Sequence, residues 1–299
     1  MHHDAIVVGG SFAGLSAATY IARGRRSVCI VDTGSPRNRF AAHSHGFLGQ
    51  DGNAPGAILA AARAQVAAYP TTSFIEAAAV GAAKEPEGFT VRLATGEVLE
   101  GTKLVLAFGI SDELPAIPGL AERWGKSVIH CPYCHGYEFS GHRLGVLHVS
   151  PRSIHQALLI SEWGPTTFYL DGAAEPDAAT LAQLAKRGVA IEPAPVRALH
   201  GEGSQLAAVE LADGRMSDLD ALYVGPPTRL NSDIAQQLGC ELEEGFFGPF
   251  LRTDGDKMTT VPGVYAAGDI TRAAHNVTWA AADGVTAGTS LHRSLVFPS

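Results

Sequence analysis

Cysteine, net positive charge and long apolar runs are all scarce in this chain of 299 residues. Four cysteines are too few for a disulfide scaffold, whereas one catalytic pair fits a cytoplasmic protein. Lysine and arginine number 22 against 30 acidic residues, so the net charge of -8 gives no basis for nucleic-acid binding. No apolar run reaches the roughly 18 residues of a membrane-spanning helix. The first strand begins at Ala5, too early for a signal peptide.

Two of the four cysteines lie in the octet Cys131-Pro-Tyr-Cys134-His135-Gly-Tyr-Glu138. Thiols at C-x-x-C spacing can close a disulfide ring or open to a dithiol, which predicts redox chemistry. His135 can accept a thiol proton and return it, because an imidazole titrates near neutral pH. Glu138 could orient this imidazole if the segment is helical; the alternative is a solvated carboxylate. We therefore assign Cys131, Cys134, His135 and Glu138 as the candidate catalytic residues.

A structural zinc site is the competing interpretation of the cysteine pair. It needs two more ligands, and the sequence offers no second C-x-x-C or H-x-x-H, while Cys29 and Cys240 each stand alone. His43 and His45, in a loop rich in glycine and polar residues, make a poor metal site without a nearby carboxylate or thiol. We predict no metal site.

The N-terminal segment has the pattern of a strand, a tight turn and a helix. Gly9 and Gly14 occupy the first and third positions of G-x-G-x-x-G, and Ser11 replaces the middle glycine. A second apolar strand ends in Asp32, about 20 residues on, where a ribose hydroxyl would be bound. These residues predict a dinucleotide site; the alternative is a purely structural turn.

A second strand and helix begin near Leu144 without the glycines of such a site. His148, Ser150 and Ser153 stand where small residues belong, and their side chains would obstruct a pyrophosphate. The next strand ends in Asp171, although a 2′-phosphate is bound best by arginine. We therefore expect a nucleotide-binding fold that does not bind NADPH. Further along, the sequence predicts a helix over 54–68, a hairpin of 89–93 with 97–101, a strand over 103–109 and a helix over 279–291.

Taken together, the Gly9–Gly14 turn with Asp32, the C-x-x-C motif and Val264-Tyr-Ala-Ala-Gly268-Asp269 resemble the thioredoxin-reductase-like family of flavoprotein disulfide oxidoreductases. The resemblance implies an α/β fold with two Rossmann-like three-layer domains. An FAD domain, 1–111 plus 229–299, is interrupted by an inserted domain, 112–228, which resembles an NADPH domain and carries the C-x-x-C motif. The resemblance also implies that the protein is a homodimer.

The same resemblance implies FAD as the cofactor. Cys134 would face the flavin, and Cys131 would exchange with substrate. The candidate cofactor-binding residues are Gly9, Ser11, Gly14, Asp32, Arg37, Asn38, Gly109, Gly268, Asp269, Asn276 and Val277.

Histidine at position 135 departs from the reductases, which carry an acid after the second cysteine. The octet instead resembles the dithiol oxidases of gliotoxin- and holomycin-type metabolites. We therefore expect an FAD-dependent thiol–disulfide oxidoreductase that is independent of NADPH and passes electrons from a dithiol to oxygen. Alternatives are a reductase of a thioredoxin-like protein with an unusual donor, an ordinary NADPH thioredoxin reductase, or a flavin redox sensor without turnover.

Overall fold

The computed structural model describes residues 2–297. The chain divides into two compact units. Unit 1 comprises the chain up to Arg39, Gly56–Ser111 and the chain from Thr228 on, and unit 2 comprises Phe40–Pro55 and Asp112–Pro227. Residues 40–55 were predicted to belong to the FAD domain, whereas they group here with the inserted unit.

Unit 1 is built on a sheet whose central strands are parallel and buried. The order β3-β2-β1-β6 is parallel, β19 extends it beside the end of β6, and β5 and β4 continue antiparallel from the start of β6. The bounds are β1 (His2–Val8), β2 (Val28–Asp32), β3 (Thr72–Glu76), β4 (Ala79–Glu85), β5 (Gly88–Leu93), β6 (Val98–Leu106) and β19 (Val264–Ala266). Nearly continuous apolar runs in β1 and β2 suit strands that are covered on both faces.

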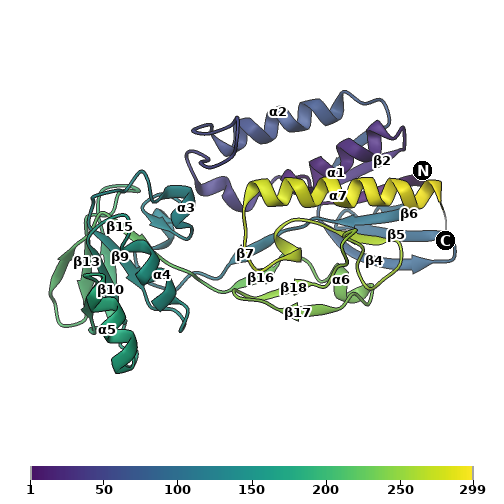
Figure 1. Ribbon diagram of the computed structural model, residues 1–299. Coiled ribbons are helices and arrows are strands. Elements are labelled where there is room, and N and C mark those ends of the chain that lie inside the picture. Colours follow the sequence, from purple (N-terminus) through teal and green to yellow (C-terminus); the bar gives the residue numbers. More distant parts are fainter. Residues whose placement is uncertain (1, 298–299) are drawn as a thin grey trace. The chain divides into compact units, whose positions relative to one another are not determined.

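Three helices cover one face of this sheet (Figure 1), namely α1 (Phe12–Arg23), α2 (Pro55–Ala67) and α7 (Val277–Val296). α7 runs along α1 at close range, because Gly284 and Gly288 face backbone atoms of Ala13 and Ala17. The opposite face packs against a smaller layer. That layer includes α6 (Ile234–Gln237), β17 (Leu242–Glu244) and β18 (Pro249–Leu251), while β7 (Ile110–Asp112) pairs with β16 (Thr228–Leu230).

Unit 2 has a sheet of five parallel strands in the order β11-β10-β9-β15-β8. The bounds are β8 (Val128–Ile129), β9 (Leu144–Leu147), β10 (Thr166–Tyr169), β11 (Ala190–Glu192) and β15 (Ala221–Tyr223). Helices α4 (Ser153–Ile160) and α5 (Ala178–Lys186) pack on one face. The antiparallel strands β12 (Val196–His200), β13 (Ala208–Leu211) and β14 (Met216–Asp218) cover the other. The predicted α/β class with two three-layer units is confirmed.

One secondary-structure prediction was wrong in detail. Residues 97–101 and 103–109 were predicted as separate strands, but β6 is one strand that pairs with β5 through its first half and with β19 through its second. A long strand can therefore serve an antiparallel and a parallel neighbour on the same edge. Among residues 2–297, no helix has both the length and the apolarity to cross a membrane.

The close approach of α1 and α7 predicts the effect of one methyl group. A Cβ on Gly284 would lie 2.1 Å from the carbonyl oxygen of Ala13, so Gly284→Ala forces the two helices apart. We expect this to lower the free energy of unfolding by about 1–3 kcal/mol, measured as a fall in the thermal midpoint. Gly56→Ala in α2 is the matched control, because its Cβ would meet nothing within 4 Å. Equal midpoints for the two variants would contradict this packing.

Candidate functional site

The turn after β1 in unit 1 is too tight for side chains at its two glycines. Gly9 has a φ of 111°, and a Cβ there would lie 2.2 Å from the Ala107 carbonyl oxygen. A Cβ on Gly14 would lie 1.8 Å from the carbonyl oxygen of Gly9. The two glycines therefore let the chain pass directly from the strand into α1, with the helix N-terminus at the end of the strand.

The N-terminus of α1 has the chemistry of an anion site. Ser11 is the N-cap residue, and its hydroxyl makes no capping bond, while the first turn, which the structure describes in full, holds no acidic residue. Helix N-termini attract phosphate through backbone N–H groups and the helix dipole. Asp32 ends β2 beside this turn, where its carboxylate accepts hydrogen bonds from Gly10 N–H at 2.9 Å and Gly34 N–H at 3.2 Å.

The other predicted cofactor residues also belong to unit 1. Arg37 and Asn38 follow β2 in a short 3-10 helix, and Gly109 lies just beyond β6. Gly268 and Asp269 follow β19, and an Arg37 nitrogen lies 3.2 Å from the Asp269 carboxylate. Carboxyl ends of parallel strands meet at one edge of a sheet, which is the usual nucleotide-binding edge.

Asn276 and Val277 mark the start of α7. The Asn276 side chain caps that helix by accepting a hydrogen bond from Thr278 N–H at 2.7 Å. These residues fit FAD, because the glycine turn and open helix end suit a pyrophosphate and Asp32 suits a ribose. Their individual roles toward FAD stay predictions.

The corresponding turn after β9 in unit 2 is closed by its own side chains. The Ser153 hydroxyl accepts hydrogen bonds from Val149 N–H at 3.0 Å and Ser150 N–H at 3.4 Å. The Ser150 hydroxyl accepts another from Arg152 N–H at 3.3 Å. These backbone donors lie at the start of α4, where a second nucleotide would place its pyrophosphate. A ligand phosphate would have to displace both hydroxyls.

The acid after β10 is also engaged within unit 2. Asp171 has a φ of 51°, and its carboxylate accepts a hydrogen bond from Val196 N–H at 2.7 Å. A carboxylate at this position repels a 2′-phosphate. The turn and the following acid therefore both lack the features of an NADPH site.

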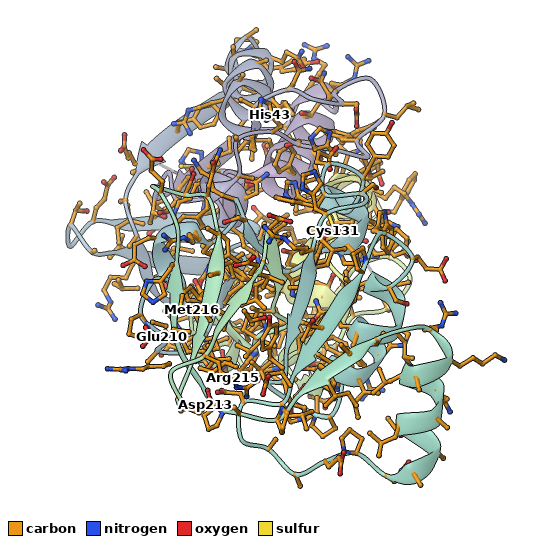
Figure 2. The ribbon with its side chains drawn as sticks, turned by 90° about the vertical axis from the view of Figure 1, so that its left-hand side faces the viewer. His43, Cys131, Glu210, Asp213, Arg215 and Met216 are labelled. Carbon is orange, nitrogen blue, oxygen red and sulfur yellow. A yellow bond between two sulfur atoms is a disulfide. The ribbon has the colours of Figure 1, made fainter. Side chains whose placement is uncertain are left out.

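The redox pair follows β8, at the carboxyl edge of the unit 2 sheet. Cys131 and Cys134 are joined by a disulfide, and Cys131 is the N-cap residue of the short helix α3 (Pro132–His135). The chain just before Cys131 is held by Gln156, whose amide donates to the carbonyl of His130 at 2.9 Å. Figure 2 shows Cys131 away from Glu210, Asp213 and Arg215 of the antiparallel layer.

Three side chains of unit 2 converge beside the disulfide. Ligand atoms of His45, His135 and Glu138 lie within 4.8 Å of one another. His45 Nε2 is 3.5 Å from a Glu138 carboxylate oxygen, and the rings of His45 and His135 meet edge to face at 6.0 Å. Helix α3 ends at His135, so Glu138 approaches the two histidines from the chain beyond the helix.

The contact between the loop of residues 40–55 and the segment after the redox pair was not predicted from the sequence. His45 and Asp51 come from this loop, and Asp51 lies 3.6 Å from His45 Nδ1. Nothing in the local sequence gives the distance between the loop and His135, which lie 90 residues apart. The repeated histidines at 43 and 45 were the one available signal.

Burial of His135 lowers its pKa, and the charges of His45 and His43 act in the same direction, while Glu138 opposes them. An imidazole with a lowered pKa is neutral at neutral pH and can accept a proton there. Cys29 and Cys240 are unpaired and buried, and burial raises the pKa of both thiols, which suits core residues rather than nucleophiles.

The chain matches a family model described as pyridine nucleotide-disulphide oxidoreductase over residues 3–147 and 171–284. It therefore belongs to this family of oxidoreductases. It is 32% identical to "Thioredoxin reductase sirT" of Leptosphaeria maculans, with 97% of this chain and 93% of that protein covered. It is 34% identical to "Thioredoxin reductase tcpT" of Claviceps purpurea, covering 95% and 92%. A solved structure described as the oxidoreductase from Agrobacterium tumefaciens is 47% identical, with both chains fully covered and a TM-score of 0.95.

These comparisons confirm the thioredoxin-reductase-like class. The protein is a flavoprotein oxidoreductase that acts on disulfides, and FAD is the cofactor that its family implies.

The lowered pKa of His135 predicts a loss of stability toward acid. Below the ordinary histidine pKa near 6.5, His135 is protonated in the unfolded chain but stays neutral in the folded chain until the pH reaches its lower native pKa. Stability therefore falls as the pH drops from about 6.5 to the lower native pKa. In His135→Gln this contribution disappears, so the difference in thermal midpoint between wild type and variant should shift in favour of the variant from pH 8 to pH 5.5. A difference that is constant across this range would contradict the lowered pKa.

Proposed function

We propose that the protein is an FAD-dependent dithiol oxidase that works through Cys131–Cys134 without a nicotinamide nucleotide. The observation that carries this proposal is the closed turn after β9. Ser153 and Ser150 already bond three backbone N–H groups that a nucleotide would need. The open turn at Gly9 and Gly14 lies in the other unit, so the proposal assigns one dinucleotide, FAD, to the chain.

The exchange begins with a substrate dithiol. One substrate thiolate attacks Cys131 Sγ, the Cys131–Cys134 bond breaks, and Cys134 leaves as a thiolate. The second substrate thiolate then attacks the substrate sulfur of the mixed disulfide and releases Cys131. The substrate becomes a disulfide, two protons leave its thiols, and two electrons stay on the cysteine pair. FAD, held by the Gly9–Gly14 turn and Asp32, would accept these two electrons, and oxygen would take them with two protons to give hydrogen peroxide.

His135 is the proposed base for this exchange. Only the thiolate attacks a disulfide, and a thiol with a pKa near 8.5 is mostly protonated at neutral pH. A neutral imidazole one residue from Cys134 can take the proton as the sulfur attacks. Glu138 carries the charge that favours the protonated imidazole, and its carboxylate also lies 3.5 Å from His45 Nε2.

A second candidate function is reduction of a disulfide in a thioredoxin-like protein, with electrons entering from another donor. The names of the relatives favour the reducing direction, because the proteins of Leptosphaeria maculans and Claviceps purpurea are both described as thioredoxin reductases. The same exchange steps then run in reverse.

We propose a small dithiol or a thioredoxin-like protein as the partner and a homodimer as the working form. We propose the cytoplasm as the compartment, where the thiols of Cys29 and Cys240 would stay reduced.

Anaerobic reduction of the flavin separates these candidates. We expect a small dithiol to bleach the flavin absorbance and NADPH to leave it unchanged. Admission of oxygen should restore the colour through many cycles, which a redox sensor without turnover would not sustain. Cys134→Ser is the control, since it should keep the yellow flavin and lose bleaching by dithiol. Rapid bleaching of the wild type by NADPH would mean that the Ser153 turn opens to nucleotide and would return the protein to the ordinary reductases.

A further inference from the structure

The cluster of His45, His135 and Glu138 has the composition and spacing of a transition-metal site. Two imidazoles and one carboxylate are the ligand set of many zinc sites that keep one position open. All three ligand atoms lie within 4.8 Å of one another, and all three residues belong to unit 2. The sequence alone predicted no metal here, because it did not show that a carboxylate approaches His45.

The distances are close to those that zinc requires. Ligands at roughly 2.0–2.2 Å from a tetrahedral zinc ion lie about 3.3 Å from one another. His45 Nε2 and the Glu138 oxygen are 3.5 Å apart, so this pair is already at the spacing of two ligands. His135 lies within 4.8 Å of both, and a small side-chain rotation would bring it to the same spacing.

Asp51 gives the cluster an outer carboxylate. Its Oδ2 lies 3.6 Å from His45 Nδ1, while its Oδ1 accepts a hydrogen bond from Gly46 N–H at 2.8 Å. Metal-binding histidines commonly bond a carboxylate through their second nitrogen, which fixes the ring and leaves the first nitrogen for the metal. The Asp51 contact is a 3.6 Å ion pair rather than a hydrogen bond, and it would shorten to a hydrogen bond if His45 Nε2 bound a metal.

We propose that His45, His135 and Glu138 bind a divalent cation of the zinc class and that this binding inhibits the enzyme. A nitrogen lone pair of His135 that coordinates a metal cannot accept a proton from a thiol. The inhibition rests on the base role given to His135 under the proposed function. The binding itself rests only on the positions of the four side chains.

Zinc binding is measured on the holoenzyme with its disulfide closed, by competition with a chromophoric zinc chelator. This state keeps Cys131 and Cys134 out of the ligand set, and the other two cysteines are buried. We expect one equivalent of Zn²⁺ to bind, with affinity reduced at least tenfold in His45→Gln and about tenfold in Asp51→Asn. Asp51→Asn keeps all three ligands, so it tests the site even if a ligand variant folds poorly.

His200→Gln is the matched control. His200 pairs with Glu210 at 2.7 Å on the exposed antiparallel layer of the same unit, and Figure 2 shows Glu210 away from Cys131. This variant should bind zinc and turn over as the wild type does. Equal zinc affinity in wild type and His45→Gln would overturn the site, as would binding that appears only after the disulfide is reduced.

Turnover distinguishes the two proposals. Inhibition of dithiol oxidation by one equivalent of zinc supports both. Zinc binding without inhibition would keep the site and remove the base role of His135. Metal-free wild type that does not oxidise dithiols would contradict the proposed function while the chelator measurement still decides the metal site.

Discussion

Hydrogen bonds from Val149 and Ser150 N–H to the Ser153 hydroxyl close the turn after β9 and distinguish it from the glycine turn after β1. Both units place a turn at the carboxyl edge of a parallel sheet, where phosphates are commonly bound. At Gly9 and Gly14 the backbone itself fills the space beside the turn, and the helix end is open to an anion. At Ser153 the hydroxyl accepts hydrogen bonds from two backbone N–H groups of the turn. On our proposal, this chain has two nucleotide-binding folds but binds only one nucleotide, FAD.

The redox centre depends on a loop that lies about 90 residues earlier in the chain. Residues 40–55 leave unit 1 after β2 and pack with unit 2, where His45 reaches Glu138. The imidazole of His135 consequently interacts with His43, His45 and Glu138, and burial lowers its pKa. The two roles that we propose for His135, base and metal ligand, exclude one another, because both use one nitrogen lone pair.

Local patterns predicted the parallel strands, the glycine turn and the cysteine pair, because each depends on neighbours in the chain. Apolar runs such as β1 and β2 predict buried strands, and C-x-x-C spacing predicts a closable disulfide, which the structure contains. The sequence also showed that serines replace glycines in the second turn. It did not show that Ser153 bonds two N–H groups, because that depends on how its side chain rotates at the start of α4.

Contacts between distant segments could not be predicted in this way. The continuous β6 pairs with β19, far along the chain, and its sequence gives no sign of where the antiparallel partner stops. His45 and Glu138 are separated by 93 positions, and their 3.5 Å approach is set by how the loop packs in unit 2. The candidate metal cluster follows from that packing.

The most direct test of the account is oxygen uptake during oxidation of a small dithiol, with no nucleotide present. We expect the purified yellow protein to consume one oxygen for each disulfide formed, through many turnovers, and to release one hydrogen peroxide. Added NADPH should leave the rate unchanged. Dithiol oxidation that needs NADP⁺, or oxygen uptake that stops after a single turnover, would contradict a dithiol oxidase that works through Cys131 and Cys134 alone.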